Sequence, residues 1–103
     1  MSLSINSPIE HDAAAGRFST QVDGLSCEAS YRLVDSGAGP VMHLLHTGVP
    51  PALAGQGIAA RLVAAALAEA RSQGWRVRPV CSYVQVYMRR YPETLDLLEG
   101  PLP

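Results

Sequence analysis

The chain has 103 residues, of which 48% are hydrophobic and 17% charged, with a formal net charge of −1. This size and composition predict one globular domain over residues 1–103. All eight basic residues are Arg, and the near-neutral balance argues against a nucleic-acid or membrane-surface binder. No apolar run approaches the roughly 20 residues of a membrane span, and the N-terminus lacks the pattern of a secretory signal.

The first half of the chain predicts three strands. Residues 17–23 alternate between apolar and polar, Gly24 marks a tight turn, and residues 25–35 alternate again, which is typical of a β-hairpin. A second turn over residues 36–40 leads to residues 41–49, which are apolar on both faces and therefore predict a central strand.

The second half predicts a helix, a strand and a helix. Pro50 and Pro51 end the third strand, and apolar residues at helical spacing follow from 57 to 73, with Gly74 as a C-terminal cap. Residues 75–80 predict a fourth strand, residues 82–91 a short helix and residues 93–99 a last helical turn before a frayed tail.

Together these elements predict an α/β (α+β) fold with a mixed sheet. An antiparallel N-terminal hairpin or meander precedes a parallel β-α-β unit over residues 41–80, and a short helix follows.

The most informative segment is the loop Ala54-Gly55-Gln56-Gly57, which leads into the helix at Ile58. Free N–H groups at the positive end of a helix form an anion site, and glycines let a diphosphate approach the backbone. The spacing does not fit a Rossmann G-x-G-x-x-G, and the absence of Lys excludes a Walker A loop. An ordinary strand-to-helix connection is the alternative.

This loop resembles the coenzyme A loop of the GNAT superfamily of N-acetyltransferases. With His46-Thr47, Pro50-Pro51 and the run from Pro79 to Tyr83, the resemblance covers residues 41–92 and indicates a short, single-domain branch. The family motif begins with Gln or Arg, where this chain has Ala54.

The resemblance implies acetyl-CoA as co-substrate and no metal. It implies that a strand N–H near Val49 polarises the thioester carbonyl. Arg89 and Arg90 are candidates to reach the 3′-phosphate of coenzyme A, although solvated charges at a helix end are the favoured interpretation of both. The expected coenzyme-binding residues are Val49, Gly55, Gln56, Gly57, Ile58, Ala59, Ala60 and Arg90.

Acetyl transfer to an amine requires a base, a donor to the thioester oxygen and an acid for the departing thiolate. Cys81 opens the last helix, where a thiol is a better nucleophile, and His46 is expected near it as base or as activator of the thiol. His43, three positions earlier, is expected on the opposite face.

Tyr83 and Tyr87 are candidate acids, as the resemblance implies for a tyrosine in the corresponding helix. Each of these four candidates also has an ordinary structural alternative: a buried apolar cysteine, a hydrogen-bonded histidine, or tyrosines packed with the hydroxyl at the rim.

These observations predict an acetyl-CoA-dependent N-acetyltransferase whose acceptor is an unidentified small amine, peptide or protein. Transfer is either direct or through Cys81. The alternative is a coenzyme A-binding sensor or accessory module with little turnover, because the family's acceptor-wall helices do not fit between the first strands. The acceptor site is therefore expected to be open or completed by a partner. The two cysteines, Cys27 and Cys81, have no disulfide or zinc spacing, so a cytoplasmic protein is expected, as a monomer or weak homodimer.

Overall fold

A computed structural model describes residues 7–103 and contains one five-stranded mixed sheet in the order β1-β2-β3-β4-β5. All neighbouring strands are antiparallel except β4 and β5, which are parallel, as the sequence predicts. The elements in chain order are β1 Glu10–Asp12, β2 Arg17–Val22, β3 Leu25–Asp35, β4 Pro40–Gly48, η2 Pro51–Leu53, α1 Ile58–Gln73, β5 Arg76–Pro79, α2 Ser82–Arg90 and η3 Pro92–Leu97. The short edge strand β1 and the turn η2 were not predicted from the sequence.

The turn between β2 and β3 fixes the register of the hairpin. Asp23 and Gly24 both have positive φ, 52° and 75°, and Val22 pairs directly with Leu25. A two-residue Asp-Gly turn with this geometry matches the right-handed twist of the flanking strands. The register then places Cys27 and Ala29 in the core, fully buried.

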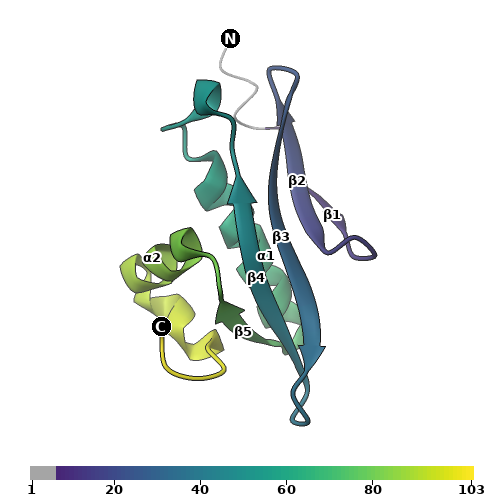
Figure 1. The fold of residues 1–103 in the computed structure, drawn as a ribbon, viewed down its shortest axis with the longest axis vertical. Helices are drawn as coiled ribbons and strands as arrows, with labels where there is room; N and C mark the ends of the chain where they lie inside the picture. Colours follow the sequence, from purple (N-terminus) through teal and green to yellow (C-terminus); the bar gives the residue numbers. More distant parts are fainter. Residues whose placement is uncertain (1–6) are drawn as a thin grey trace.

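Helix α1 covers one face of the sheet. In Figure 1 it lies behind β3 and β4, while α2 and η3 lie to the side of β5. Its buried residues repeat at helical spacing and pack against strand residues such as Phe18, Leu44 and Val77. The opposite face, called the open face below, is not crossed by any helix of the described chain (Figure 1).

Strand β4 contains a β-bulge that decides where its histidines point. Tyr31 pairs with Leu44 but Ser30 pairs with His46, so Leu45 is an extra residue on β4. His43 pairs with Arg32, two residues from Ser30 on β3, and therefore lies on the same open face as His46. The expectation that His43 and His46 lie on opposite faces is wrong, because the extra residue, Leu45, shifts the alternation of side chains along β4 by one position.

The same point on β4 is where its pairing with β5 ends. The carbonyl oxygen of Leu44 accepts bonds from the N–H groups of Val80, at 3.0 Å, and Cys81, at 2.9 Å. Pairing with β5 stops at Pro79, whereas β4 continues to Gly48 against β3. The two strands part beyond this point, and the place where they part is called the β4–β5 cleft, or the cleft, below.

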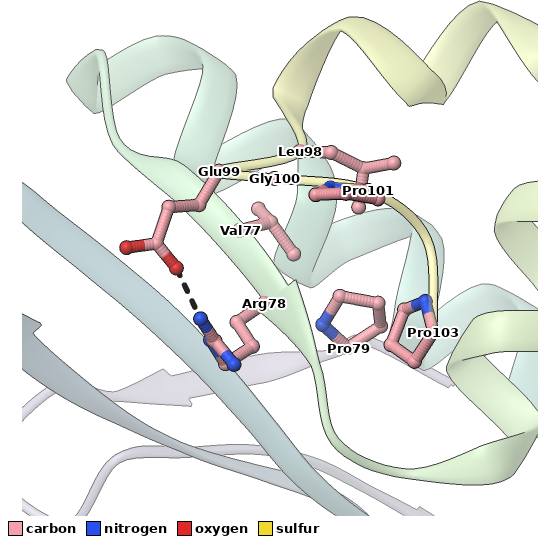
Figure 2. Close-up of a pocket in the computed structure, with 8 residues that line it drawn as sticks. All are labelled: Val77, Arg78, Pro79, Leu98, Glu99, Gly100, Pro101 and Pro103. Atoms are coloured by element: carbon pink, nitrogen blue, oxygen red, sulfur yellow. Dashed lines mark hydrogen bonds and ion pairs between the residues drawn. The ribbon is translucent and has the colours of Figure 1, made fainter.

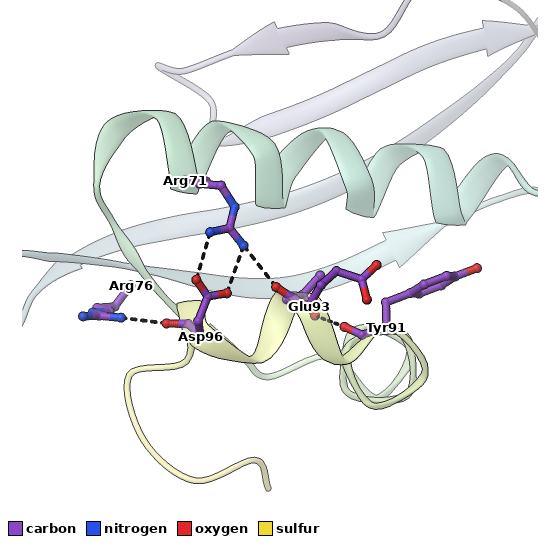
Figure 3. A network of polar contacts seen from close by, with 6 residues as sticks. Arg71, Arg76, Tyr91, Glu93 and Asp96 are labelled. Atoms are coloured by element: carbon purple, nitrogen blue, oxygen red, sulfur yellow. Dashed lines mark hydrogen bonds and ion pairs between the residues drawn. The ribbon is translucent and has the colours of Figure 1, made fainter.

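The C-terminal segment is tied to α1 and β5 rather than frayed. Arg71 on α1 donates two bonds of 2.9 Å to the Asp96 carboxylate, and Arg76 donates to the Asp96 carbonyl (Figure 3). The tail then lies over β5 and encloses a hollow of about 230 Å³, where Arg78 contacts Glu99 at 3.1 Å (Figure 2). Leu102 packs against the core, which explains why the predicted fraying is wrong.

Candidate functional site

The glycine loop delivers unpaired backbone donors to the start of α1. Gly55 and Gly57 have φ values of 81° and 78°, in the left-handed region where glycine is favoured. The first helical bond runs from the Arg61 N–H to the Gly57 carbonyl, at 3.1 Å, so the N–H groups of residues 58–60 have no helical acceptor. No side chain caps this end and no acidic residue lies in the first turn. The end is therefore suited to an anion.

An apolar pocket of about 320 Å³ adjoins this loop. Most of the expected coenzyme-binding residues line it, and Tyr83 closes it from α2. Leu53 and Ala54 also line it; the sequence carried no signal for Leu53, which η2 brings there. Gln56 and Ala60 flank the lining without belonging to it. The residues that line the pocket are Val49, Leu53, Ala54, Gly55, Gly57, Ile58, Ala59 and Tyr83.

Cys81 is paired with Thr47, not with His46. The Thr47 Oγ1 and Cys81 Sγ atoms lie 3.8 Å apart across the cleft. Thr47 pairs with the buried Ala29 and so belongs to the face that α1 covers, and Cys81 packs partly against the core. The sequence motif contained Thr47, but the role of its hydroxyl was not predicted.

The main chain of Thr47 also faces the cleft. The Tyr31 N–H bonds to the Gly16 carbonyl at 2.8 Å, and so points toward β2. Ala29, two residues away, has the same orientation, and its partner Thr47 therefore directs its N–H away from β3. That side is the one from which β5 has diverged. A strand N–H near Val49 is expected from the sequence to polarise the thioester carbonyl, and Thr47 lies two residues before Val49.

His46 lies on the open face, at the bulge. An ideal Cβ at Gly48 would lie 3.2 Å from His46 Nε2, so the imidazole rests against a glycine. Its cross-strand partner is Ser30. The histidine and the cysteine that were expected to act together thus flank the cleft from opposite sides of the sheet.

The two candidate tyrosines occupy different surroundings. Burial raises the pKa of both Tyr83 and Tyr87, with a further contribution from Tyr91. For Tyr83, nearby Arg90 acts in the opposite direction, which places this arginine on the same side of α2. Tyr83 lines the pocket at the loop. Tyr87 instead packs against Tyr91 over the middle of α1, with ring centroids 4.7 Å apart and the two rings tilted by 42°.

No cluster of three or more potential metal ligands exists within residues 7–103. None of the described helices is long and apolar enough to cross a membrane.

Comparison with known proteins gives consistent results. Residues 17–97 match the family model described as GCN5-related N-acetyl-transferase. The mouse protein NATD1 is 31% identical over 84 residues, which cover 82% of this chain and 76% of NATD1. A solution structure from Staphylococcus aureus, described as a GCN5-like candidate N-acetyltransferase, superposes with a TM-score of 0.71 at 27% identity, covering 98% of this chain and 93% of that one.

Proposed function

This chain belongs to the GCN5-related N-acetyltransferase family and is an acyltransferase, and we propose that it moves an acetyl group from acetyl-CoA to an amine. The observation that carries the proposal is the glycine loop at the start of α1, which opens on an apolar pocket beside the β4–β5 cleft. An anion-binding helix end and an apolar channel suit the diphosphate and the pantetheine arm of one ligand.

In this proposal the coenzyme lies on the α1 side of the sheet. The N–H groups of Gly57 and of residues 58–60 bind the diphosphate, and Val49 and Ile58 contact the pantetheine arm. Arg90, near Tyr83 on α2, is the proposed partner of the 3′-phosphate. The thioester then lies in the cleft, with its carbonyl oxygen toward the N–H of Thr47.

The acceptor amine approaches from the open face. His46 takes a proton from the ammonium group, and the neutral nitrogen attacks the thioester carbon. The new C–N bond forms as the C–S bond breaks, and the departing thiolate takes a proton from Tyr83. The second proton that the nitrogen loses on becoming an amide restores the Tyr83 phenol through solvent, and the proton on His46 is released to solvent. Tyr83 is assigned this role because it lines the pocket at the glycine loop, and its phenol is protonated at neutral pH.

Direct transfer is favoured over a Cys81-bound acetyl group by one observation. Cys81 lies at the start of α2, but no base is paired with its thiol: the polar neighbour of Cys81 Sγ is the Thr47 hydroxyl, while His46 faces the other side. We therefore assign Cys81 a place beside the thioester on the coenzyme side. A cytoplasmic setting is part of the proposal, since both cysteines are free thiols.

Calorimetric titration with coenzyme A and acetyl-CoA tests the donor, and an amine panel tests the transfer. We expect binding of acetyl-CoA in the wild type, His46→Ala and Cys81→Ala proteins, and loss of transfer in His46→Ala alone. Mass spectrometry after mixing with acetyl-CoA should show no acetyl adduct on Cys81. Binding without transfer by the wild-type protein would instead favour a coenzyme A sensor or accessory module.

A further inference from the structure

A concavity lies along the edge of β3, beside the turn between β1 and β2. It has a volume of about 440 Å³ and is called the β3 groove below. The turn between β1 and β2 forms one wall, and the bulge residue Leu45 forms another. The residues that line it are Ala13, Ala14, Ala15, Gly16, Ser30, Tyr31, Arg32, Leu33 and Leu45.

The sequence and the backbone explain why this groove exists. β2 begins at Arg17, so the edge of β3 beyond Ser30 has no strand beside it, only the Ala-rich turn. Gly16 holds that turn close, because its carbonyl accepts the Tyr31 N–H and an ideal Cβ on Gly16 would collide with the Tyr31 carbonyl oxygen. Small side chains in the turn leave the space over Arg32 empty.

Arg32 is the single charged side chain that lines the β3 groove. No carboxylate in residues 7–103 forms an ion pair with it: the nearby carboxylates of Glu28 and Glu99 are paired with Arg17 and Arg78. Asp12, at the start of the turn, accepts the Ala15 N–H. An unpaired guanidinium in an otherwise uncharged groove suits an anionic group, which it can bind through two parallel bonds.

Two further side chains continue the row of Arg32 across the open face. Arg32 pairs across the sheet with His43, and His43 pairs with Arg78. Arg78 forms an ion pair with Glu99, whereas no carboxylate in residues 7–103 pairs with Arg32. Arg32 is therefore the cation of this row that is left for a ligand.

The β3 groove ends at the proposed acetyl-transfer site. Leu45 precedes His46 on β4, and Ser30, which lines the groove, is the cross-strand partner of His46. Arg32 is two residues further along β3, or about 7 Å at the usual rise of a strand. An acceptor lying in the groove can therefore place its amine at His46 and a second group at Arg32.

We propose that the β3 groove binds the acceptor, and that the acceptor is an aliphatic amine carrying an anionic group, held by Arg32. This inference rests on the proposed acetyl transfer and names the class of its substrate. Leu45 and the alanines of the turn contact the aliphatic part.

The test compares 5-aminovalerate with 5-aminopentanol, two amines that differ only in the carboxylate. We expect kcat/KM to be about tenfold higher for 5-aminovalerate, as for one charge-assisted contact. Arg32→Gln should abolish this preference through the acceptor KM and leave the acetyl-CoA affinity unchanged. Arg17→Gln is the control, since Arg17 is on the same face, paired with Glu28, and outside the groove.

The outcomes separate this inference from the proposed function. Equal kcat/KM for both amines, an equal effect of Arg32→Gln on both, or acetyl-CoA binding without acetylation of either amine would overturn the inference. Failure to bind acetyl-CoA would overturn the proposed function itself. A lysine peptide flanked by Glu, compared with one flanked by Gln, then tells whether the anionic group belongs to a small molecule or to a polypeptide, because only the latter gives a Glu preference larger than that of 5-aminovalerate.

Discussion

Two glycines at opposite ends of α1 allow a matched test of the coenzyme site. Gly57 precedes the helix with φ of 78° and Gly74 follows it with φ of 75°. An ideal Cβ at either position meets nothing within 4 Å. Replacing either by Ala therefore costs only the left-handed backbone conformation, about 1 kcal/mol, or about 4 °C in Tm for a chain of this size. Both variants should lose the same stability without ligand.

Coenzyme should then distinguish them. At a concentration of 100 times Kd, a ligand stabilises the native state by about 2.7 kcal/mol, which corresponds to about 10 °C here. The Gly74→Ala protein should keep this gain. In Gly57→Ala the methyl group projects into the space above the loop, where the diphosphate would meet the N–H groups. Loss of one charged hydrogen bond weakens binding about tenfold, and the gain falls to about 1.4 kcal/mol.

Thermal unfolding with and without acetyl-CoA measures both quantities in one assay. The apo Tm reports the backbone cost, and the ligand-induced shift reports the site. Equal shifts in Gly57→Ala and Gly74→Ala would refute the placement of the diphosphate at this loop. A larger apo loss in one variant would show that the two backbone costs are not matched.

Three further predictions follow from the geometry. Gly48→Ala should displace the His46 imidazole by a few tenths of an ångström and lower kcat severalfold with acetyl-CoA affinity intact, measured by steady-state kinetics; unchanged kcat would argue against His46 as base. Tyr83→Phe should lower kcat by about a hundredfold, whereas Tyr87→Phe, away from the pocket, should not; equal effects would contradict the assignment of the acid. The hydrogen-bonded guanidinium lowers the pKa of Asp96, so this carboxylate stabilises the fold above its unfolded pKa, near 3.8, and the contribution is lost as pH falls through the lower folded value. Asp96→Asn should therefore flatten the acid limb of Tm against pH, and an unchanged limb would disprove the contribution.

Local signals explain how much of the fold the sequence predicts. The Asp23-Gly24 turn, the alternation of β3 and the glycines that bound α1 each act over a few residues, and the structure confirms the elements that they predict. Strand β1 has three exposed residues and no apolar pattern, so only pairing with β2 defines it. The C-terminal tail is held by contacts with α1 and β5, distant in sequence, which composition cannot reveal.

The sequence identifies the residues of the glycine loop at the candidate site, but it does not show on which face of the sheet the other candidate side chains lie. The motif locates Gly55, Gly57 and Tyr83, and the structure brings them around one pocket. The side on which His46 lies depends on the extra residue in β4. The bulge lies at two adjacent leucines, of which Leu44 is buried and Leu45 exposed. From the sequence alone the same two leucines predict a regular strand that is apolar on both faces, so the bulge could not be recognised.

That single extra residue organises the whole proposed reaction. It coincides with the end of the β4–β5 ladder, so the cleft opens where the parity of β4 changes. His46 is thereby placed on the open face, and Thr47, the next residue of the strand, on the α1 face. Base and coenzyme contacts then come from two sides of one cleft, and a sheet covered by helix on one side only leaves the other free for the acceptor (Figure 1). In the proposed reaction, a chain of this size therefore separates its two substrates without additional helices around the acceptor, because the open face of the sheet itself forms the acceptor site.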